Sequence, residues 1–467
     1  MSFDSPAFLF FFLPLLLVLE ALVRPVKAKN ALLCCAGLVF YSFGELWATA
    51  LLVVSAFVNW LLGLLAVRRG RAAVVLAVVL DLGLLAVCKY LGFFGQGLAL
   101  FGARLSLPDI AAPAGVSFFT FKGISYVVDA SRRPEAATKN FGKALFYISF
   151  LPEVMSGPLS RFEDFEAQLG RRGCTARDRA LGLRRFCLGL AKKLLLSGGA
   201  ASAADAAFSA GAALDARLAW LGAAAYCLQL YFDFSGYSDM ALGLGRALGF
   251  RCPENFEHPY AAVSITDFWR RWHISLSLWF RDYLYIPLGG GRKGALRKAL
   301  NKFLVFFLCG LWHGANLTFV LWGVWHGLLS ALESLGLLNV PRWRRCAAGR
   351  LLSRAYAMLA VCLGFVMFRA ESAAQGFEYI AAMFTGWCFL PEATLLLESA
   401  FGGWTAVCLV LGLAFSLPAP RALKRAAGGR AAAALEGLSY AACAILFVLS
   451  CAAMASGGFA PFIYFQF

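Results

Sequence analysis

The sequence has 467 residues, of which 61% are hydrophobic and 15% are charged, with a formal net charge of +17 at pH 7. A mean hydropathy of +0.71 excludes an ordinary water-soluble globular protein. Because only helices and closed barrels satisfy their backbone groups in lipid, the recurring apolar runs predict an all-α polytopic membrane protein. No polar block is long enough for a separate soluble domain, so we expect one integral-membrane domain over 1–467.

The lysines and arginines fall in short connections between the apolar runs. The basic clusters lie at 24–29, 68–71, 132–143, 171–193, 270–302, 342–354 and 421–430. The positive-inside rule places all of them on the cytoplasmic side. This distribution argues against a nucleic-acid partner, while anionic lipid or an anionic CoA-like donor remains an alternative use of part of the charge.

With these clusters inside, the apolar runs predict spans in chain order. The first run carries no Lys or Arg before it and no cleavage site after it, so we expect a retained span and not a signal peptide. The expected spans are 7–23, 31–43, 46–67, 72–91, 115–130, 186–205, 217–234, a pair within 303–338, 355–368, 401–418 and 433–455. The total is ten to twelve, an even number, with both termini outside.

One apolar run does not suit a span. The run 141–161 has basic residues at both ends and contains Pro152, Gly157 and Pro158. Such a run fits a re-entrant or interfacial element better than a membrane-crossing helix.

The stretch 264–288 is apolar but contains too many charges for an ordinary span. It predicts a helix at the membrane surface or along a cavity, in which Asp267 reaches Arg270 or Arg271 and Trp269 stacks one turn before His273. The alternative is an interfacial helix with an aromatic belt. The candidate cavity or donor-binding residues are Asp267, Arg270, Arg271 and Arg281 here and Asn316 further along the chain, while His273 is a candidate catalytic residue.

His313 follows a nearly uninterrupted apolar run from Phe303. At 1.5 Å per residue it lies roughly 15 Å from Lys302, where an imidazole is costly unless it has a task. Its alternative role is a hydrogen-bonded structural histidine. Asn316 either shares its helical face or forms a break with Gly314, and we interpret His326 as structural.

Other chemical signals are weak. The fourteen cysteines show no CxxC or metal-like spacing, so no metal and no bound cofactor are expected. PLGGGRKG lacks the Ser or Thr of a phosphate-binding loop, and no GxSxG motif is present. The remaining options are an intramembrane histidine acting as a general base, or a polar pathway through the membrane.

Two long motifs, RRWHISLSLWFRDYLYIPLGG and GLWHGANLTFVLWGVWHG, resemble the membrane-bound O-acyltransferase family. Within it they are most similar to the bacterial branch that acetylates polysaccharides such as alginate. Weaker agreement in GVSFFTFKGISYVVD, FLPEVMSGPLSRF and DFSGYSDMALGLG extends the resemblance over most of 115–330. This region would be the catalytic core of the family's helical fold, built around a central cavity.

The resemblance implies that His313 matches the essential intramembrane histidine and His273 a second functional position. It further implies an acetyl group from a cytoplasmic thioester, with acetyl-CoA as donor, passed across the cytoplasmic membrane for O-acetylation of a polysaccharide. A separate extracytoplasmic SGNH-type acetyltransferase is the implied partner. The alternatives are D-alanyl or other acyl transfer by the same fold, or a transporter with a histidine-lined path.

The chain ends in FIYFQF, which the topology places outside. One interpretation is an aromatic belt that anchors the last helix. The other is an acyl relay, in which the hydroxyl of Tyr464 is acylated near His313 and passes the group outward.

Overall fold

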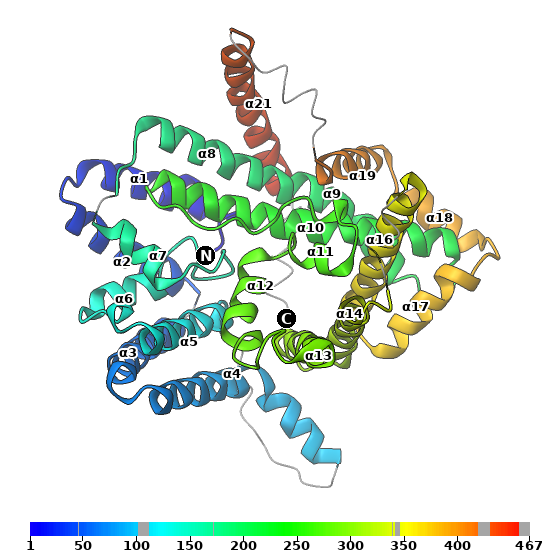
Figure 1. Ribbon diagram of the computed structural model, residues 1–467. Coiled ribbons are helices and arrows are strands. Elements are labelled where there is room, and N and C mark those ends of the chain that lie inside the picture. The colour runs from blue at the N-terminus through cyan, green and yellow to red at the C-terminus, as the bar shows by residue number, and fades with distance from the viewer. Residues whose placement is uncertain are drawn as a thin grey trace. The chain divides into compact units, whose positions relative to one another are not determined.

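The computed structural model describes residues 1–44, 46–100, 112–170, 172–338, 340, 346–418 and 430–456, and all the regular secondary structure in them is helical (Figure 1). The chain divides into two compact units. The first contains Met1–Phe186 and Tyr237–Glu254, and the second contains Cys187–Gly236 and Asn255–Phe467. Helices α8 and α10 each contribute residues to both units.

The first unit is built from the N-terminal helices. They are η1 (Phe8–Phe12), α1 (Leu13–Leu22), α2 (Val26–Ser42), α3 (Leu46–Arg69), α4 (Arg71–Leu100), α5 (Val116–Arg132), η2 (Pro134–Ala136), α6 (Phe141–Ile148), α7 (Phe162–Leu169), and parts of α8 (Ala176–Ala191) and α10 (Ala216–Ala247). Helices α3, α4 and α5 pack against one another. Close approach of α3 to α5 requires Gly63, because a Cβ there would lie 2.4 Å from the ring of Tyr126.

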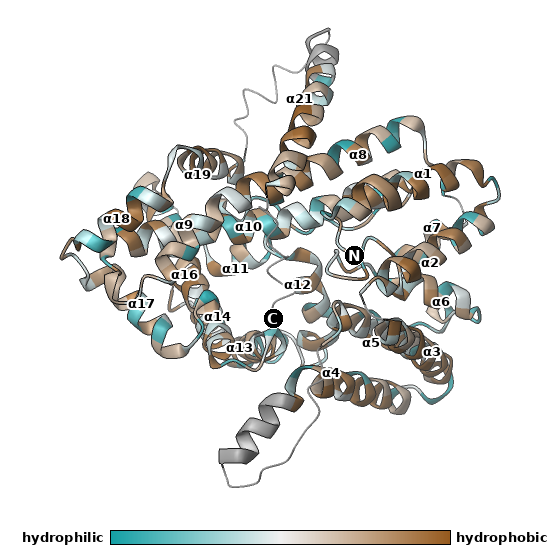
Figure 2. Cartoon of the chain, turned by 180° about the vertical axis from the view of Figure 1, so that it is seen from behind, coloured by the Kyte–Doolittle hydropathy of each residue, from teal (hydrophilic) through white to brown (hydrophobic). Residues whose placement is uncertain are grey.

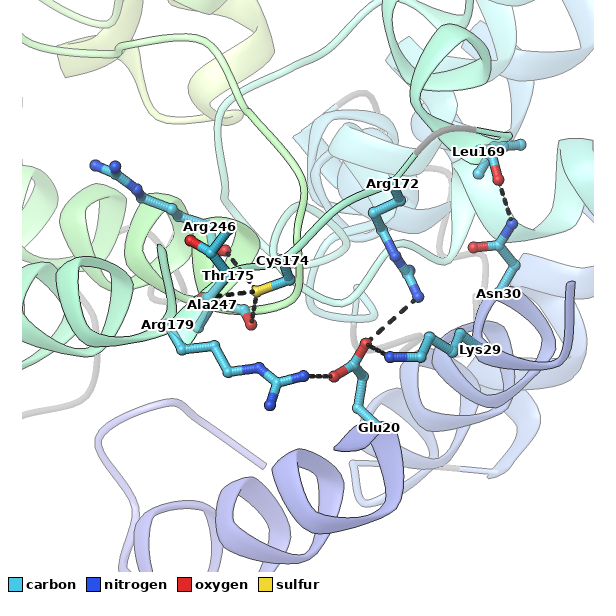
Figure 3. A network of polar contacts seen from close by, with 10 residues as sticks. All are labelled: Glu20, Lys29, Asn30, Leu169, Arg172, Cys174, Thr175, Arg179, Arg246 and Ala247. Atoms are coloured by element: carbon cyan, nitrogen blue, oxygen red, sulfur yellow. Dashed lines mark hydrogen bonds and ion pairs between the residues drawn. The ribbon is translucent and has the colours of Figure 1, made fainter. Parts of the chain in front are cut away.

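A buried polar network in the first unit joins two of the basic clusters (Figure 3). The carboxylate of Glu20, which is 1% exposed, accepts from Lys29 Nζ at 2.7 Å and from the guanidinium of Arg179. The guanidinium of Arg172 lies 3.7 Å from the same carboxylate. The clusters 24–29 and 171–193, which charge bias assigns to one side of the membrane, therefore meet at one acidic residue.

The second unit contains the remaining helices. They are η3 (Lys192–Ser197), α9 (Gly198–Phe208), η4 (Gly211–Ala213), η5 (Pro259–Ala261), α11 (Ile265–Trp269), α12 (Ile274–Phe280), η6 (Arg281–Tyr285), α13 (Gly294–His313), α14 (Leu317–Leu335), α16 (Ala347–Arg369), α17 (Ala373–Thr385), α18 (Pro391–Ala400), α19 (Gly403–Ser416) and α21 (Arg430–Ala455), with the rest of α8 and α10.

Helices α13 and α14 form a tight antiparallel hairpin, which confirms the helical pair expected within 303–338. Gly310 and Gly323 face each other at the crossing, and a Cβ on Gly323 would lie 2.6 Å from the carbonyl oxygen of Phe306. Small residues of this kind let helix backbones approach closely, as is common in membranes.

Four helical segments in the described parts of the chain have the length and apolar composition to cross a membrane. They are Leu46–Arg69, Arg71–Leu91, Ala347–Arg369 and Glu436–Ala455; the bent pair α18 and α19, which meet at 76°, raises the total to five if it forms one broken span. Figure 2 shows the hydrophobic colour along α3 and α4. Length and apolar composition together identify fewer spans than the expected ten to twelve, because helices such as α10 and α13 mix apolar turns with charged ones. The expected number therefore stays a prediction.

The run 141–161 is not one long helix: α6 ends at Ile148, and turns follow.

The prediction of one continuous helix over 264–288 was wrong, because the chain breaks between α11 and α12 at 270–273. His273 there has φ of 45°, a left-handed conformation that no helix interior accommodates.

Candidate functional site

The break before α12 is held by Asn255. Its Oδ1 accepts from the backbone N–H of Ser275 at 3.3 Å and from the Ser275 hydroxyl at 3.0 Å, and lies 3.1 Å from His273 Nδ1. The backbone N–H of Ile274 donates to the Asn255 carbonyl at 2.9 Å. Sequence reasoning did not identify Asn255, which lies before the first long motif and carries no chemical signal of its own.

These contacts determine the tautomer of His273. Because an N–H group donates to the same Asn255 atom, that atom is the amide oxygen, and His273 Nδ1 must carry the proton that it shares with it. The ring is 2% exposed, and burial lowers the pKa of His273 to about 3. His273 is therefore a neutral imidazole whose Nε2 bears the lone pair.

Two arginines around α11 and η6 are paired with aspartates. Arg271 Nε lies 3.0 Å from Asp267 Oδ1, as the helical spacing predicted, and Arg281 Nε lies 2.7 Å from Asp282. Glu333 of α14 accepts from the first two backbone N–H groups of α11, those of Ile265 at 2.7 Å and Thr266 at 2.9 Å. Sequence reasoning missed Glu333, whose only signal is an acidic side chain near the end of an apolar run.

A cavity of about 710 Å³ lies within the second unit, between α11, α12, α13 and α14. Its size falls within the range of small-molecule and cofactor sites. Five of its wall residues are basic and two are acidic: Arg270, Arg271, Arg281, Lys298, Lys302, Asp267 and Glu333. Burial, together with nearby Lys298 and Arg270, lowers the pKa of Lys302 to about 8. The excess of cations makes the cavity suited to an anionic ligand.

The structure brings His273, Asp267, Arg270, Arg271 and Arg281 together on the wall of this cavity. His313 and Asn316 are not among the wall residues. Asn316 begins α14: its side-chain oxygen accepts from the Thr318 N–H at 3.1 Å and its amide donates to the Glu371 carbonyl at 2.9 Å. Of the two arrangements expected for Asn316, the structure therefore has the helix break. Tyr464 lies outside the described residues.

His313 is the last residue of α13 and is 4% exposed. Its ring centroid lies 5.1 Å from those of Trp322 and Phe368, and both contacts are edge-on. The ring centroid of Trp322 also lies 5.5 Å from that of Trp269, a residue of the cavity wall. A short series of aromatic rings thus connects the cavity with His313.

His326 lies one turn beyond Trp322 on α14 and is fully buried. Its ring centroid is 5.2 Å from those of Trp322 and Trp269. The spacing of Trp322 and His326 in the second motif would have indicated this shared face. The interpretation of His326 as structural fits its burial, although within the described part of the chain neither ring nitrogen has a hydrogen-bond partner.

The protein has apolar helices of span length, a basic cavity and buried histidines. These features define a polytopic membrane protein with a site suited to acid–base chemistry on an anionic ligand. The family model described as membrane-bound O-acyltransferase matches residues 99–372. The chain belongs to the membrane-bound O-acyltransferase family, and it is an O-acyltransferase of the membrane. The resemblance carried by the two motifs is thereby confirmed.

Three relatives illustrate the range of the family. The "Probable alginate O-acetylase AlgI" of Pseudomonas putida is 37% identical over 100% of both chains. The "Peptidoglycan O-acetyltransferase" of Helicobacter pylori is 32% identical over 68% of this chain and 67% of its own. The "Teichoic acid D-alanyltransferase" of Bacillus subtilis is 30% identical over 43% of this chain and 53% of its own.

Proposed function

We propose that the protein takes an acetyl group from acetyl-CoA on the cytoplasmic side and passes it across the cytoplasmic membrane for O-acetylation of an extracytoplasmic polysaccharide. The observation that carries this proposal is the basic, His273-lined cavity in a chain similar over its whole length to an alginate O-acetylase. The phosphates of CoA fit a wall with five cations.

In the proposed reaction, His313 removes the proton from an acceptor hydroxyl as its oxygen attacks the thioester carbonyl carbon. The new C–O bond forms, the C–S bond breaks, and the CoA thiolate takes up the proton that His313 received. A positioned base of this kind contributes about 10²–10⁴-fold to the rate. The Trp322 ring lies between Trp269 on the cavity wall and His313, so the reaction requires the reacting groups to reach His313 past this ring.

The proposed role of His273 is positional. Its neutral ring offers Nε2 as a hydrogen-bond acceptor, while Nδ1 is held by Asn255. An acceptor at a fixed place orients a hydroxyl or an amide N–H of the substrates. Arg270, Arg271 and Arg281 would hold the anionic part of the donor, and Asp267 would orient Arg271.

Transfer to a polymer outside the membrane needs further parts. We propose a separate extracytoplasmic SGNH-type acetyltransferase as partner, both termini outside, and either an acyl relay or an anchor at Tyr464. D-alanyl transfer is the second candidate, because a teichoic acid D-alanyltransferase is similar over 43% of the chain. Acetyl transfer is preferred since the similarity to the alginate O-acetylase covers all of it.

The test uses the full-length protein in nanodiscs with the SGNH-type partner and a polysaccharide acceptor. Radiolabelled acetyl-CoA and a D-alanyl carrier thioester are offered in parallel. The proposal expects acetyl label in the polymer and none from D-alanine. Label from D-alanine alone would establish the second candidate, and no label from either would refute both.

A further inference from the structure

The wall of the basic cavity changes in character along α13. Lys298 and Lys302 line it near the start of the helix, and Val305, Phe306 and Cys309 line it further on. At 1.5 Å per residue, this change takes place over roughly 16 Å. A ligand with an anionic end and a small apolar end therefore fits the cavity lengthwise.

Ser330 and Trp269 lie where the wall changes. Gly327 of α14 packs against α13 at Phe303, since a Cβ on Gly327 would lie 3.1 Å from the Phe303 carbonyl. Ser330 lies one turn further along α14, and because the two helices are antiparallel it is level with the turn of α13 that holds Lys302. The Trp269 ring lies 5.2 Å from that of Phe306. Both residues line the cavity, Ser330 on the charged side of the change and Trp269 on the apolar side.

Each of the two side chains has a buried polar atom without a protein partner. Trp269 Nε1 and Ser330 Oγ make no hydrogen bond to any described residue, and Ser330 is 2% exposed. Ser334, one turn along the same wall, shows the usual alternative, since its hydroxyl donates to the Ser330 carbonyl at 2.7 Å. An unsatisfied buried donor is costly, and an indole N–H can only donate, so the missing partner is a hydrogen-bond acceptor.

We propose that Trp269 and Ser330 bind the carbonyl oxygen of the thioester donor, a step that rests on the proposed function. The pantetheine arm of the donor then leads from Ser330 past Lys298 toward its phosphates, and the acyl methyl lies toward Phe306 and Cys309. His326 packs at 87° to Trp269 and fixes the position of its indole.

This placement also serves the chemistry. When the hydroxyl oxygen bonds to the carbonyl carbon, an electron pair moves onto the carbonyl oxygen, and it returns as the C–S bond breaks. The Trp269 N–H and the Ser330 O–H stabilise that transient charge and keep their protons throughout. Trp322 and His326 do not line the cavity, so they are not assigned as donors to this oxygen.

The test compares acetyl-CoA with CoA, which lacks the acyl carbonyl. Affinities for both are measured with the full-length protein in nanodiscs for wild type, Trp269→Phe, Ser330→Ala and the matched control Ser334→Ala. Trp269→Phe and Ser330→Ala should each weaken acetyl-CoA binding by about 2- to 12-fold, the equivalent of one hydrogen bond, and leave CoA binding unchanged. Ser334→Ala should change neither affinity.

Equal weakening of both ligands, or no weakening of either, would overturn the assignment. If Trp269→Phe does not fold, Ser330→Ala against Ser334→Ala decides the question alone. A wild type that transfers acetyl groups but binds CoA and acetyl-CoA equally would refute the carbonyl site and leave the proposed function intact. A wild type that neither binds nor turns over acetyl-CoA would refute both.

Discussion

Asn255→Ala is expected to disable the site without touching a proposed catalytic group. The substitution removes the oxygen that holds three donors, of which the Ser275 hydroxyl can rotate to another partner. The His273 Nδ1–H and the Ser275 N–H then remain buried and unsatisfied. At about 1–2 kcal/mol for each, the structure loses roughly 2–4 kcal/mol, and a mobile His273 lowers acetyl transfer by about 10–100-fold.

Asn255→Asp separates positioning from packing. An aspartate keeps an oxygen for all three donors, but its charge favours the imidazolium form and raises the pKa of His273 from its value of about 3. In wild type, this neutral histidine contributes stability that is complete above its ordinary pKa of 6.5 and is lost as the pH falls toward 3. Asn255→Asp should therefore fold normally, tolerate acid better than wild type, and lose activity at a higher pH than wild type as the pH is lowered.

Thermal unfolding in detergent and acetyl-transfer rates from pH 5 to 8 measure these effects. Wild-type stability and activity in Asn255→Ala would refute the claim that Asn255 holds His273. An Asn255→Asp protein with an unchanged pH profile would refute the claim that activity depends on a neutral His273.

Three further predictions concern the cavity, the topology and the tail. Because the pKa of Lys302 is lowered to about 8, the KM for acetyl-CoA should rise between pH 7 and 9 as this lysine loses its charge. Lys302→Arg should abolish the rise, and identical pH profiles of KM in wild type and Lys302→Arg would contradict this role of Lys302. In a cysteine-depleted background, Lys298→Cys should resist an impermeant thiol reagent added from outside, and efficient labelling would reverse the topology. Tyr464→Phe should abolish polymer acetylation at an unchanged protein level if the relay operates, whereas wild-type acetylation would leave only the anchor.

The sequence predicted features that depend on local spacing. Apolar runs located the helical hairpin of α13 and α14, and helical spacing predicted that Asp267 pairs with Arg270 or Arg271, of which the structure has Arg271. It did not predict the break at His273, because that backbone conformation depends on Asn255, which lies 18 residues earlier in the chain.

The remaining differences have the same origin. Glu333 meets the start of α11 across 68 residues, and no local pattern indicates that contact. Nor could the sequence show that the basic cavity in the second unit is lined by His273 and not by His313. Spacing along one helix cannot show which rings of other helices enclose an imidazole, here those of Trp322 and Phe368.

The central claim is that His313 acts as a base in acetyl transfer from acetyl-CoA. The most direct measurement is single-turnover transfer of radiolabelled acetyl groups by wild type, His313→Ala and His313→Gln in nanodiscs, with the partner and polysaccharide present. We expect normal membrane insertion and acetyl-CoA binding in both variants, and a rate lowered by about 10²-fold or more. A wild-type rate in His313→Ala would contradict the account.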